Sequence, residues 1–356
     1  MRGDRHALDA LRAAIDPIDD DARRAALARH ATLVKPPGSL GRLEQLGAQL
    51  AGIAGRCPPP VPESPAVVIA AADHGVHAHG VTPWPQEITR QMVRLFCAGQ
   101  AGVNAVARTV GATVAVLDVG CADPPPAHPL LRSDRVRAGT ADLTTAPAMS
   151  RTDAIRAVCA GATMASDLIA DGADLLVTGD MGIANTTASA CLIAAFTGAD
   201  AGQVTGPGAG ATEDALAHKT AVVRRALDRH RPDPADPLGV LATVGGLEHA
   251  ALVGVLLAGA RLRVPVLLDG VITNAAALCA AAWCPAVTGH LIAGHRSPEP
   301  GATVALDHLR LAPLYDLRLR LGEGTGGLLA VPLAQAAART LREMAVLDEL
   351  AVDGFS

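Results

Sequence analysis

One carboxylate stands alone in a glycine-rich stretch near the end of the chain, within the sequence RLRLGEGTGG at residues 318–327. Glu323 has a glycine on each side, and such a stretch continues neither a helix nor a strand well. On a closed, poorly solvated loop its pKa would rise towards neutral, which suits a general base. No GxSxG or HExxH motif offers other chemistry. We therefore predict that Glu323 is the catalytic base, the alternative being a solvated loop residue.

Two further stretches have the composition of anion-binding loops. GDMGIANTTASA, residues 179–190, ends a predicted strand and opens a predicted helix, so free N–H groups, the helix dipole and two threonine hydroxyls would meet an anion. An ordinary N-cap among small residues is the alternative. TGPGAGATEDALAHK, residues 205–219, carries Lys219 on the helix that follows, from where it could reach a phosphate. It lacks the GK[ST] of a P-loop, and a flexible turn is its alternative.

Histidines gather in ADHGVHAHGVTPWPQEITRQM, residues 72–92, but they do not predict a metal site. Histidines two or three residues apart on a loop are common by chance, and no second set of ligands is fixed by the spacing. The residues that would have to bind the ion are Asp73, His74, His77 and His79.

Two more polar clusters follow predicted strands. AGHRSPEPG, residues 293–301, offers His295, Arg296, Ser297 and Glu299, with an exposed loop as the alternative. VLLDGVIT, residues 266–273, is superficially similar to a diphosphate-binding motif that has two adjacent acids. Here a glycine replaces the second acid, which favours a strand end followed by a helix start.

The elements that would position these residues alternate along the chain. Short runs of Val, Ile, Leu and Ala end in Asp, Gly or His, and a helical stretch follows each run. The runs lack period-2 alternation, as expected of strands buried on both faces. We therefore predict an α/β fold: a parallel Rossmann-like sheet with helices on both faces and ligands at the carboxyl ends of the strands. The predicted strands are residues 66–75, 112–120, 173–182, 240–246, 264–270 and 289–295.

Both ends of the chain have helical spacing instead. Residues 4–55 read as helices, CPPPVPESP at 57–65 as a linker, and 328–351 as a final helical segment. We predict a small helical domain made of residues 1–60 and 330–356, and a large α/β catalytic domain made of residues 61–329.

Composition excludes several classes of protein. The 356 residues are 50% hydrophobic and carry a net charge of −5 without a basic stripe, which argues against nucleic-acid binding. No apolar run reaches the roughly 18 residues of a membrane span, and the charged N-terminus does not resemble a signal peptide. Seven irregularly spaced cysteines indicate free thiols in a reducing compartment. We expect a cytoplasmic protein without partners in membrane or nucleic acid.

Taken together, the motifs resemble the nicotinate-nucleotide–dimethylbenzimidazole phosphoribosyltransferase family from about Lys35 to Glu349. The stretches that carry the resemblance, in order, are KPPGSLGRLE, ADHGV, GVTPWPQEITRQMV, AGVNAVAR, GDMGIANTTAS, VGGLEHAALVG, PVLLDGVIT, IAGHRSPEPG and LGEGTGG. The resemblance implies a homodimer with no cofactor and no metal, which moves the phosphoribosyl group of nicotinate mononucleotide to 5,6-dimethylbenzimidazole. The products would be nicotinate and alpha-ribazole 5′-phosphate, a precursor of the nucleotide loop of cobalamin.

The resemblance also assigns roles to residues. Glu323 would be the general base, and Thr82 and Gln91 fall in the segment that lines the pocket for the base acceptor. The residues that would bind the nucleotide are Asp180, Gly182, Asn185, Thr186, Gly208, Lys219 and Ser297.

The chain departs from the family pattern on the phosphate side. Asp180 and Ala184 stand where the family usually has GEMGIGNTT, and Pro207 and Ala209 stand where it has GRGTG. These changes put nucleotide affinity in doubt more than the type of reaction. Two other functions stay open: the same chemistry with a different acceptor, such as another benzimidazole, a purine or a phenol, and a non-catalytic nucleotide-binding relative. The presence of Glu323 disfavours the latter.

Overall fold

Six parallel strands form one sheet in the order β3-β2-β1-β4-β5-β6 in this computed structural model, which describes residues 2–208, 210 and 212–350. Strand β1 lies between β2 and β4, where Ile69 is in register with Val116 on one side and Gly179 on the other. The predicted parallel α/β fold is thereby confirmed. The strand order reverses between β1 and β4, and ligands bind outside the carboxyl ends of strands at such a point. The strands are β1 Pro65–Ala72, β2 Thr113–Gly120, β3 Leu131–Ser133, β4 Leu175–Met181, β5 Val266–Leu268 and β6 Leu291–Ala293.

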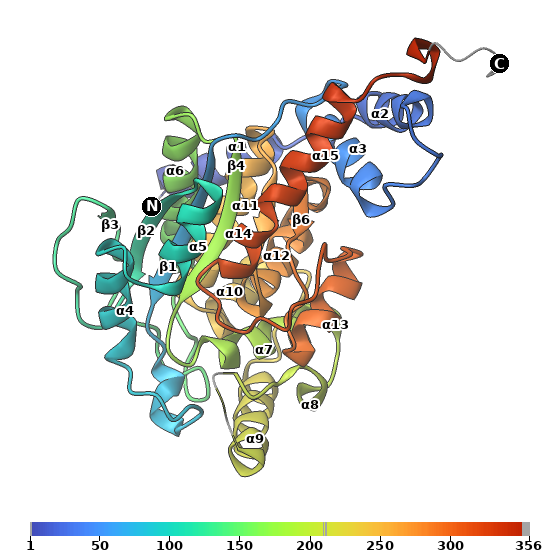
Figure 1. Ribbon diagram of the computed structural model, residues 1–356. Helices are drawn as coiled ribbons and strands as arrows, with labels where there is room; N and C mark the ends of the chain where they lie inside the picture. Colours follow the sequence, from blue (N-terminus) through green and yellow to red (C-terminus); the bar gives the residue numbers. More distant parts are fainter. Residues whose placement is uncertain (1, 209, 211, 351–356) are drawn as a thin grey trace.

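Helices connect the strands and enclose the sheet (Figure 1). Side chains cap several of them: Asp19 accepts the N–H of Ala22 at the start of α2, and Ser150 forms a capping box with Asp153 at the start of α6. The α-helices are α1 Arg2–Ala13, α2 Asp20–Thr32, α3 Arg42–Ala54, α4 Ile88–Cys97, α5 Gly102–Val110, α6 Arg151–Ala170, α7 Asn185–Thr197, α8 Ala201–Val204, α9 Glu213–His230, α10 Pro237–Val244, α11 Leu247–Arg261, α12 Val271–Trp283, α13 Pro300–Leu309, α14 Thr325–Leu329 and α15 Val331–Glu343. Short 3₁₀ helices are η1 Gly75–His79, η2 Pro285–His290 and η3 Leu347–Glu349.

Both faces of the sheet are buried, which explains why its strands lack polar alternation. On β1, Val68 and Ala70 belong to the core shared with α6, α7, α11 and α12, whereas Val67 and Ile69 belong to the core shared with α4, α5 and α15. Every residue of β1 is buried. The central strands are therefore rigid supports for whatever follows their carboxyl ends.

Two of the covering helices pack with their backbones almost in contact. A Cβ atom on Gly161 of α6 would lie 1.8 Å from the carbonyl oxygen of Ala251 on α11, and one on Gly254 would lie 1.9 Å from that of Val158. Only glycine allows this approach. The core is thus closed by small residues in a chain that has few aromatic ones.

Helices from the two ends of the chain lie together. Figure 1 shows α2 and α3 beside α15, and Ala26, Ala48, Ala51 and Leu341 form a buried cluster among these helices. By contrast, α1 packs against α6 and α11 of the main body. The division into a domain of residues 1–60 with 330–356 and a domain of 61–329 stays a prediction, and residues 351–356 lie outside the described residues.

One predicted strand is wrong and one strand was missed. Residues 240–246 were expected to be a strand, but Pro237–Val244 is helix α10, which Asp236 caps by accepting the N–H of Gly239. A short apolar run gives the same sequence pattern in a buried strand and in a buried helix, so periodicity cannot distinguish the two. The three-residue edge strand β3 is too short to produce a pattern. Among the described residues, no helix has both the length and the apolar character needed to cross a membrane.

Candidate active site

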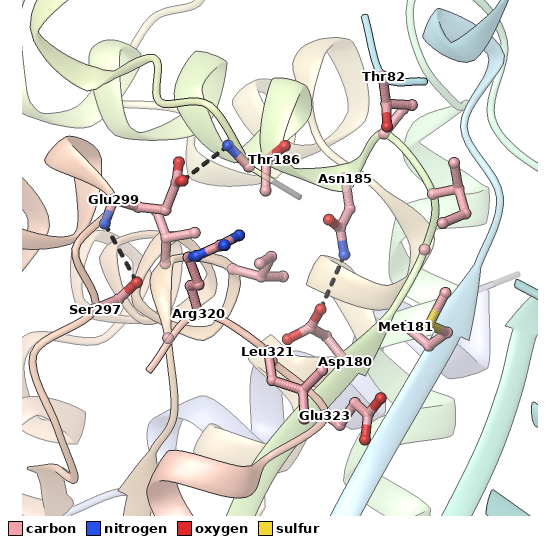
Figure 2. A pocket seen from close by; sticks show the side chains of 18 of the residues that line it. Thr82, Asp180, Met181, Asn185, Thr186, Ser297, Glu299, Arg320, Leu321 and Glu323 are labelled. Atoms are coloured by element: carbon pink, nitrogen blue, oxygen red, sulfur yellow. Dashed lines mark hydrogen bonds between the residues drawn. The ribbon is translucent and has the colours of Figure 1, made fainter. Parts of the chain in front are cut away.

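A pocket lies at the carboxyl ends of β1, β4, β5 and β6, where the strand order predicts a ligand (Figure 2). Its empty space is about 900 Å³, part of which is open to solvent. Of the ten residues predicted to act in catalysis or binding, nine line it: Thr82, Asp180, Gly182, Asn185, Thr186, Gly208, Lys219, Ser297 and Glu323. The tenth, Gln91, is an exposed residue of α4 and is not part of the wall. Its role stays a prediction that this geometry does not support.

Glu323 is buried at the floor of this pocket, with 5% of its surface exposed. Its Oε2 atom accepts the backbone N–H of Val103, in the first turn of α5, at 3.1 Å. Burial raises the pKa of Glu323; the N–H of Val103 opposes this rise and the charge of Asp269 adds to it. A carboxylate with a raised pKa is a better proton acceptor near neutral pH.

The loop that carries Glu323 lies directly on the end of β4. A Cβ atom on Gly179 would be 2.4 Å from the carbonyl oxygen of Glu323, so only glycine allows the two backbones to meet. Glu323 itself has a left-handed backbone with a φ of 66°. Such strain in a residue other than glycine is typical of functional sites.

Asp269, which follows β5, holds this loop. Its carboxylate accepts the N–H groups of Gly324, Gly326 and Gly327 at 3.3, 2.6 and 2.9 Å. From the sequence alone, this aspartate is predicted only to mark the end of a strand. Its three donors lie 55 to 58 residues further along the chain, so no local pattern could reveal the contact.

Asp180 lies at the end of β4 and faces the same cavity. Its Oδ2 atom accepts a hydrogen bond from the side-chain amide of Asn185 at 2.9 Å, as Figure 2 shows. Its Oδ1 atom is buried and has no hydrogen-bond partner among the described residues. Burial raises the pKa of Asp180 well above its usual range, and the nearby carboxylates of Asp269, Glu248 and Glu323 add to the rise. Asp180 is therefore a candidate hydrogen-bonding group for a ligand in this pocket.

A buried cation stands across the pocket from Glu323. The Nζ atom of Lys219, on α9, donates to the hydroxyl of Thr186 at 2.7 Å and to the carbonyl of Gly206 at 3.0 Å. Burial lowers the pKa of Lys219 to about 8, against the opposing charge of Glu299. Glu299 in turn accepts the N–H of Gly208 at 2.8 Å. Lysine, threonine hydroxyl and the start of α7 together form a site suited to an anion.

The departures from the family pattern lie around this anion site. Ala184 is the residue before α7, and its φ of 77° is left-handed, which favours glycine. Pro207 lines the pocket beside Gly208. Ala209 lies outside the described residues. Proline at 207 leaves one wall of the pocket without the cation that the family pattern has there.

Other wall residues were not singled out from the sequence. Arg320 and Leu321 come from the segment just before Glu323, and both line the pocket (Figure 2). The sequence signal that could have found them is their position beside Glu323 in the stretch RLRLGEGTGG. Leu321 and Trp84 supply apolar surface, which suits a flat aromatic base.

Among the described residues, one group of three side chains could present ligands to a metal ion: His74, Glu248 and His249. The Nε2 atom of His74 and the Nδ1 atom of His249 each lie 2.8 Å from the same oxygen of Glu248, and all three side chains are fully buried. The His74 contact is a hydrogen bond, whereas the His249 contact is a close approach of a possible ion pair. His77 and His79 instead face Trp84 and Asp142, so the four residues considered from the sequence are not gathered.

Fold and site together define a class: an α/β protein with a buried carboxylate and a wall suited to an anion in one pocket, as in a group-transfer enzyme. Residues 15–352 match the phosphoribosyltransferase family. The chain is 55% identical to a nicotinate-nucleotide–dimethylbenzimidazole phosphoribosyltransferase of Salinispora tropica, over 97% of this chain and 99% of that protein. It is 51% identical to one of Chloroflexus aurantiacus, over 95% and 96% of the two chains.

A solved structure agrees with these relatives. The crystal structure of the enzyme of the same name from Thermus thermophilus matches with a TM-score of 0.89 at 47% identity, over 93% of this chain and 98% of that one. The chain therefore belongs to the nicotinate-nucleotide–dimethylbenzimidazole phosphoribosyltransferase family.

Proposed function

We propose that this protein transfers the phosphoribosyl group of nicotinate mononucleotide to 5,6-dimethylbenzimidazole. Nicotinate and alpha-ribazole 5′-phosphate are the products, and the latter supplies the nucleotide loop of cobalamin. One observation carries the proposal beyond the relatives' names: the pocket holds a buried carboxylate with a raised pKa, Glu323, together with a buried ammonium, Lys219. The first suits proton removal from an acceptor, and the second suits a phosphate.

The reaction asks for a base and for no acid. In nicotinate mononucleotide the leaving ring nitrogen is already a cation, so it takes the electron pair of the breaking C1′–N bond and departs neutral. One nitrogen of the benzimidazole attacks C1′ while the other gives its proton to Glu323. Attack opposite the leaving group inverts C1′, which gives the α-riboside.

Orientation supplies much of the remaining acceleration. In our proposal Lys219, Thr186 and the N–H groups at the start of α7 hold the phosphate, while Ser297, Gly182 and Gly208 enclose the phosphoribosyl group. Asn185 and the free oxygen of Asp180 then face the ribose. Thr82 lies on the side of the acceptor.

A turnover assay tests the function directly. The protein is mixed with nicotinate mononucleotide and dimethylbenzimidazole, nicotinate release is followed, and the riboside is identified by mass spectrometry. Release of nicotinate that depends on dimethylbenzimidazole is the expected result. A panel of other benzimidazoles, purines and phenols tests the alternative that another acceptor is preferred. Binding of the nucleotide without turnover on any acceptor would favour the non-catalytic alternative.

We further propose that the chain works in the cytoplasm as a homodimer, as the family resemblance implies. Leu317, on the segment before Glu323, is 64% exposed and offers apolar surface to a second copy. Sedimentation equilibrium of the purified chain tests this association, for which a mass of twice 36.0 kDa is expected.

A further inference from the structure

Asp269 is a buried carboxylate that does not line the pocket but controls a loop that does. It is 1% exposed and directly follows β5, the short strand beside β4. Through both its oxygens it accepts three backbone N–H groups, from Gly324, Gly326 and Gly327. Charge-assisted bonds of this kind are about twice as strong as neutral ones.

Backbone hydrogen bonds close this turn: the N–H of Thr325, where α14 begins, donates to the carbonyl of Gly322 at 3.1 Å, and that of Leu328 donates to the carbonyl of Gly324 at 2.9 Å. Gly322, Glu323 and Gly324 are three successive residues with left-handed backbones, a conformation that costs energy for Glu323. The only side chain besides Asp269 that bonds to the described backbone of Gly324–Gly327 is Tyr315, whose hydroxyl donates to the carbonyl of Gly326 at 2.6 Å. Of the side chains that bond this backbone, Asp269 makes the most contacts, and it ties Gly324 and the first turn of α14 to the end of β5 beside the strained residue.

We propose that Asp269 is the positioning residue of the base: it fixes the glycine loop so that the carboxylate of Glu323 points into the pocket next to α5. This inference rests on the proposed function of Glu323. A displacement of only about 1 Å at a reacting group costs up to about a hundredfold in rate, so a residue that never touches substrate can control turnover.

Asp269 also acts on Glu323 through its charge. The titratable and charged groups near Asp269 and Glu323 are Asp180 on β4, His295 after β6, and Tyr315 and Arg320 on the segment before α14. The Nε2 atom of His295 lies 3.6 Å from an oxygen of Asp269. Because the negative charge of Asp269 helps to raise the pKa of Glu323, its removal lowers that pKa. The acid limb of the pH–rate profile then moves to lower pH.

The test is Asp269→Asn, which keeps the shape of the side chain. It replaces one carboxylate oxygen, an acceptor for the backbone N–H groups of the loop, by an NH₂ group, which can only donate. We expect kcat to fall roughly 10- to 100-fold, with KM for nicotinate mononucleotide within about twofold of the wild type and the acid limb displaced downwards. Asp118→Asn is the matched control: Asp118 is also a buried aspartate of a strand end, and it accepts the N–H groups of Gly120 and Cys121 at 3.0 and 2.8 Å. Its kcat and pH profile should not change.

A double-mutant cycle separates positioning from general damage. In the Glu323→Gln background, Asp269→Asn should produce no further loss, because the residue acts through the base. If the two losses multiply, or if Asp269→Asn leaves kcat and the acid limb unchanged, the inference is wrong. Should Asp269→Asn not fold, Tyr315→Phe removes the other side-chain bond to the same backbone. Its expected loss in kcat is roughly three- to tenfold, smaller than that of Asp269→Asn because it removes a single hydrogen bond. An unchanged kcat in Tyr315→Phe would overturn the inference. Wild-type turnover is measured first, since its absence would overturn the proposed function itself.

Discussion

Lys219 is an ammonium group held almost out of water before any substrate arrives. It is 2% exposed, and its partners are a hydroxyl and a carbonyl, both neutral. Burial without a directly paired anion disfavours the charged form, which explains the lowered pKa. A phosphate would complete this site by supplying the missing negative charge.

Replacement of Lys219 by methionine keeps the apolar stem and removes the charge. A charge-assisted contact is worth about 1.5–3 kcal/mol, so the dissociation constant of nicotinate mononucleotide should rise roughly 10- to 100-fold at pH 7. Calorimetric titration measures this constant. Lys35→Met is the matched control, since Lys35 is the chain's other lysine and pairs with Glu44 at 2.7 Å. An equal loss in both variants would place the phosphate elsewhere.

The same residue gives nucleotide binding a pH dependence of known sign. Below a pH of about 8 the free protein carries the ammonium, and above it the proton is lost. Binding that needs the ammonium therefore weakens as pH rises through 8, by up to about tenfold per pH unit. Titrations at pH 7 and 9 measure the loss, which should be absent in Lys219→Met. A wild-type constant that is the same at both pH values would contradict this role.

At the scale of residues, the sequence indicates which side chains line the pocket, but not which residues hold them in position. Glu323 and Lys219 lie in motifs whose composition already indicates a base and an anion site, and the structure brings both to one pocket. Asp269 could not be assigned, because its partners become neighbours only when the segment after α13 returns over the ends of β4 and β5. Gln91 stays a prediction: a motif places it near the site, and in the structure it is an exposed residue of α4 outside the pocket wall.

Among the elements, helix α7 begins with a strained residue. Ala184 has a φ of 77°, a conformation that costs an L-residue about 1–2 kcal/mol. Ala184→Gly should therefore increase the free energy of unfolding by about 0.5–1 kcal/mol, since the greater flexibility of glycine in the unfolded chain offsets part of the gain. Urea denaturation measures the change.

Ala188→Gly, in the interior of the same helix, is the control for Ala184→Gly. Ala188 is fully buried. There glycine should lower stability by about 1 kcal/mol. If both substitutions destabilise, the left-handed start of α7 is not a source of strain.

The elements were predictable where their patterns were long or bounded by clear signals. The strands at residues 66–75, 112–120 and 173–182 were found because each is a long apolar run that ends in glycine or a polar residue. Helix α10 was taken for a strand because its apolar run is short and buried all round. Asp236 followed by Pro237 is the local pattern of a helix start, and it favours a helix over a strand for this run.

At the scale of the whole molecule, a charge network lies in the centre of the fold. Burial opposes ionisation of Glu248, but His74 and His249 outweigh it and hold the pKa of Glu248 well below its usual range. For His74 too, the pull of Glu248 outweighs burial and raises its pKa. His249 forms a 2.8 Å hydrogen bond with Ser189 of α7, so this network joins the segment after β1, α11 and the helix at the pocket.

Glu248→Gln should destabilise the fold, because it removes one partner of a buried ion pair. The expected loss is about 3 kcal/mol at pH 7, measured by urea denaturation. Since the carboxylate's pKa is lowered by folding, its contribution is present above the ordinary value of 4.5 and declines as pH falls below it. The difference between wild type and variant should therefore shrink in acid. Glu213→Gln, on the exposed start of α9, is the control, and a loss equal to it would contradict the network's role.

The claim that joins all scales is that this molecule transfers a phosphoribosyl group with Glu323 as the base. The most direct measurement compares nicotinate release by wild type and Glu323→Gln, with nicotinate mononucleotide and dimethylbenzimidazole both saturating. We predict that turnover in the variant falls by roughly 10²–10⁴, the usual contribution of a positioned general base, while nucleotide affinity changes little. Turnover equal to that of the wild type, in a variant that is folded and binds the nucleotide, would contradict the account.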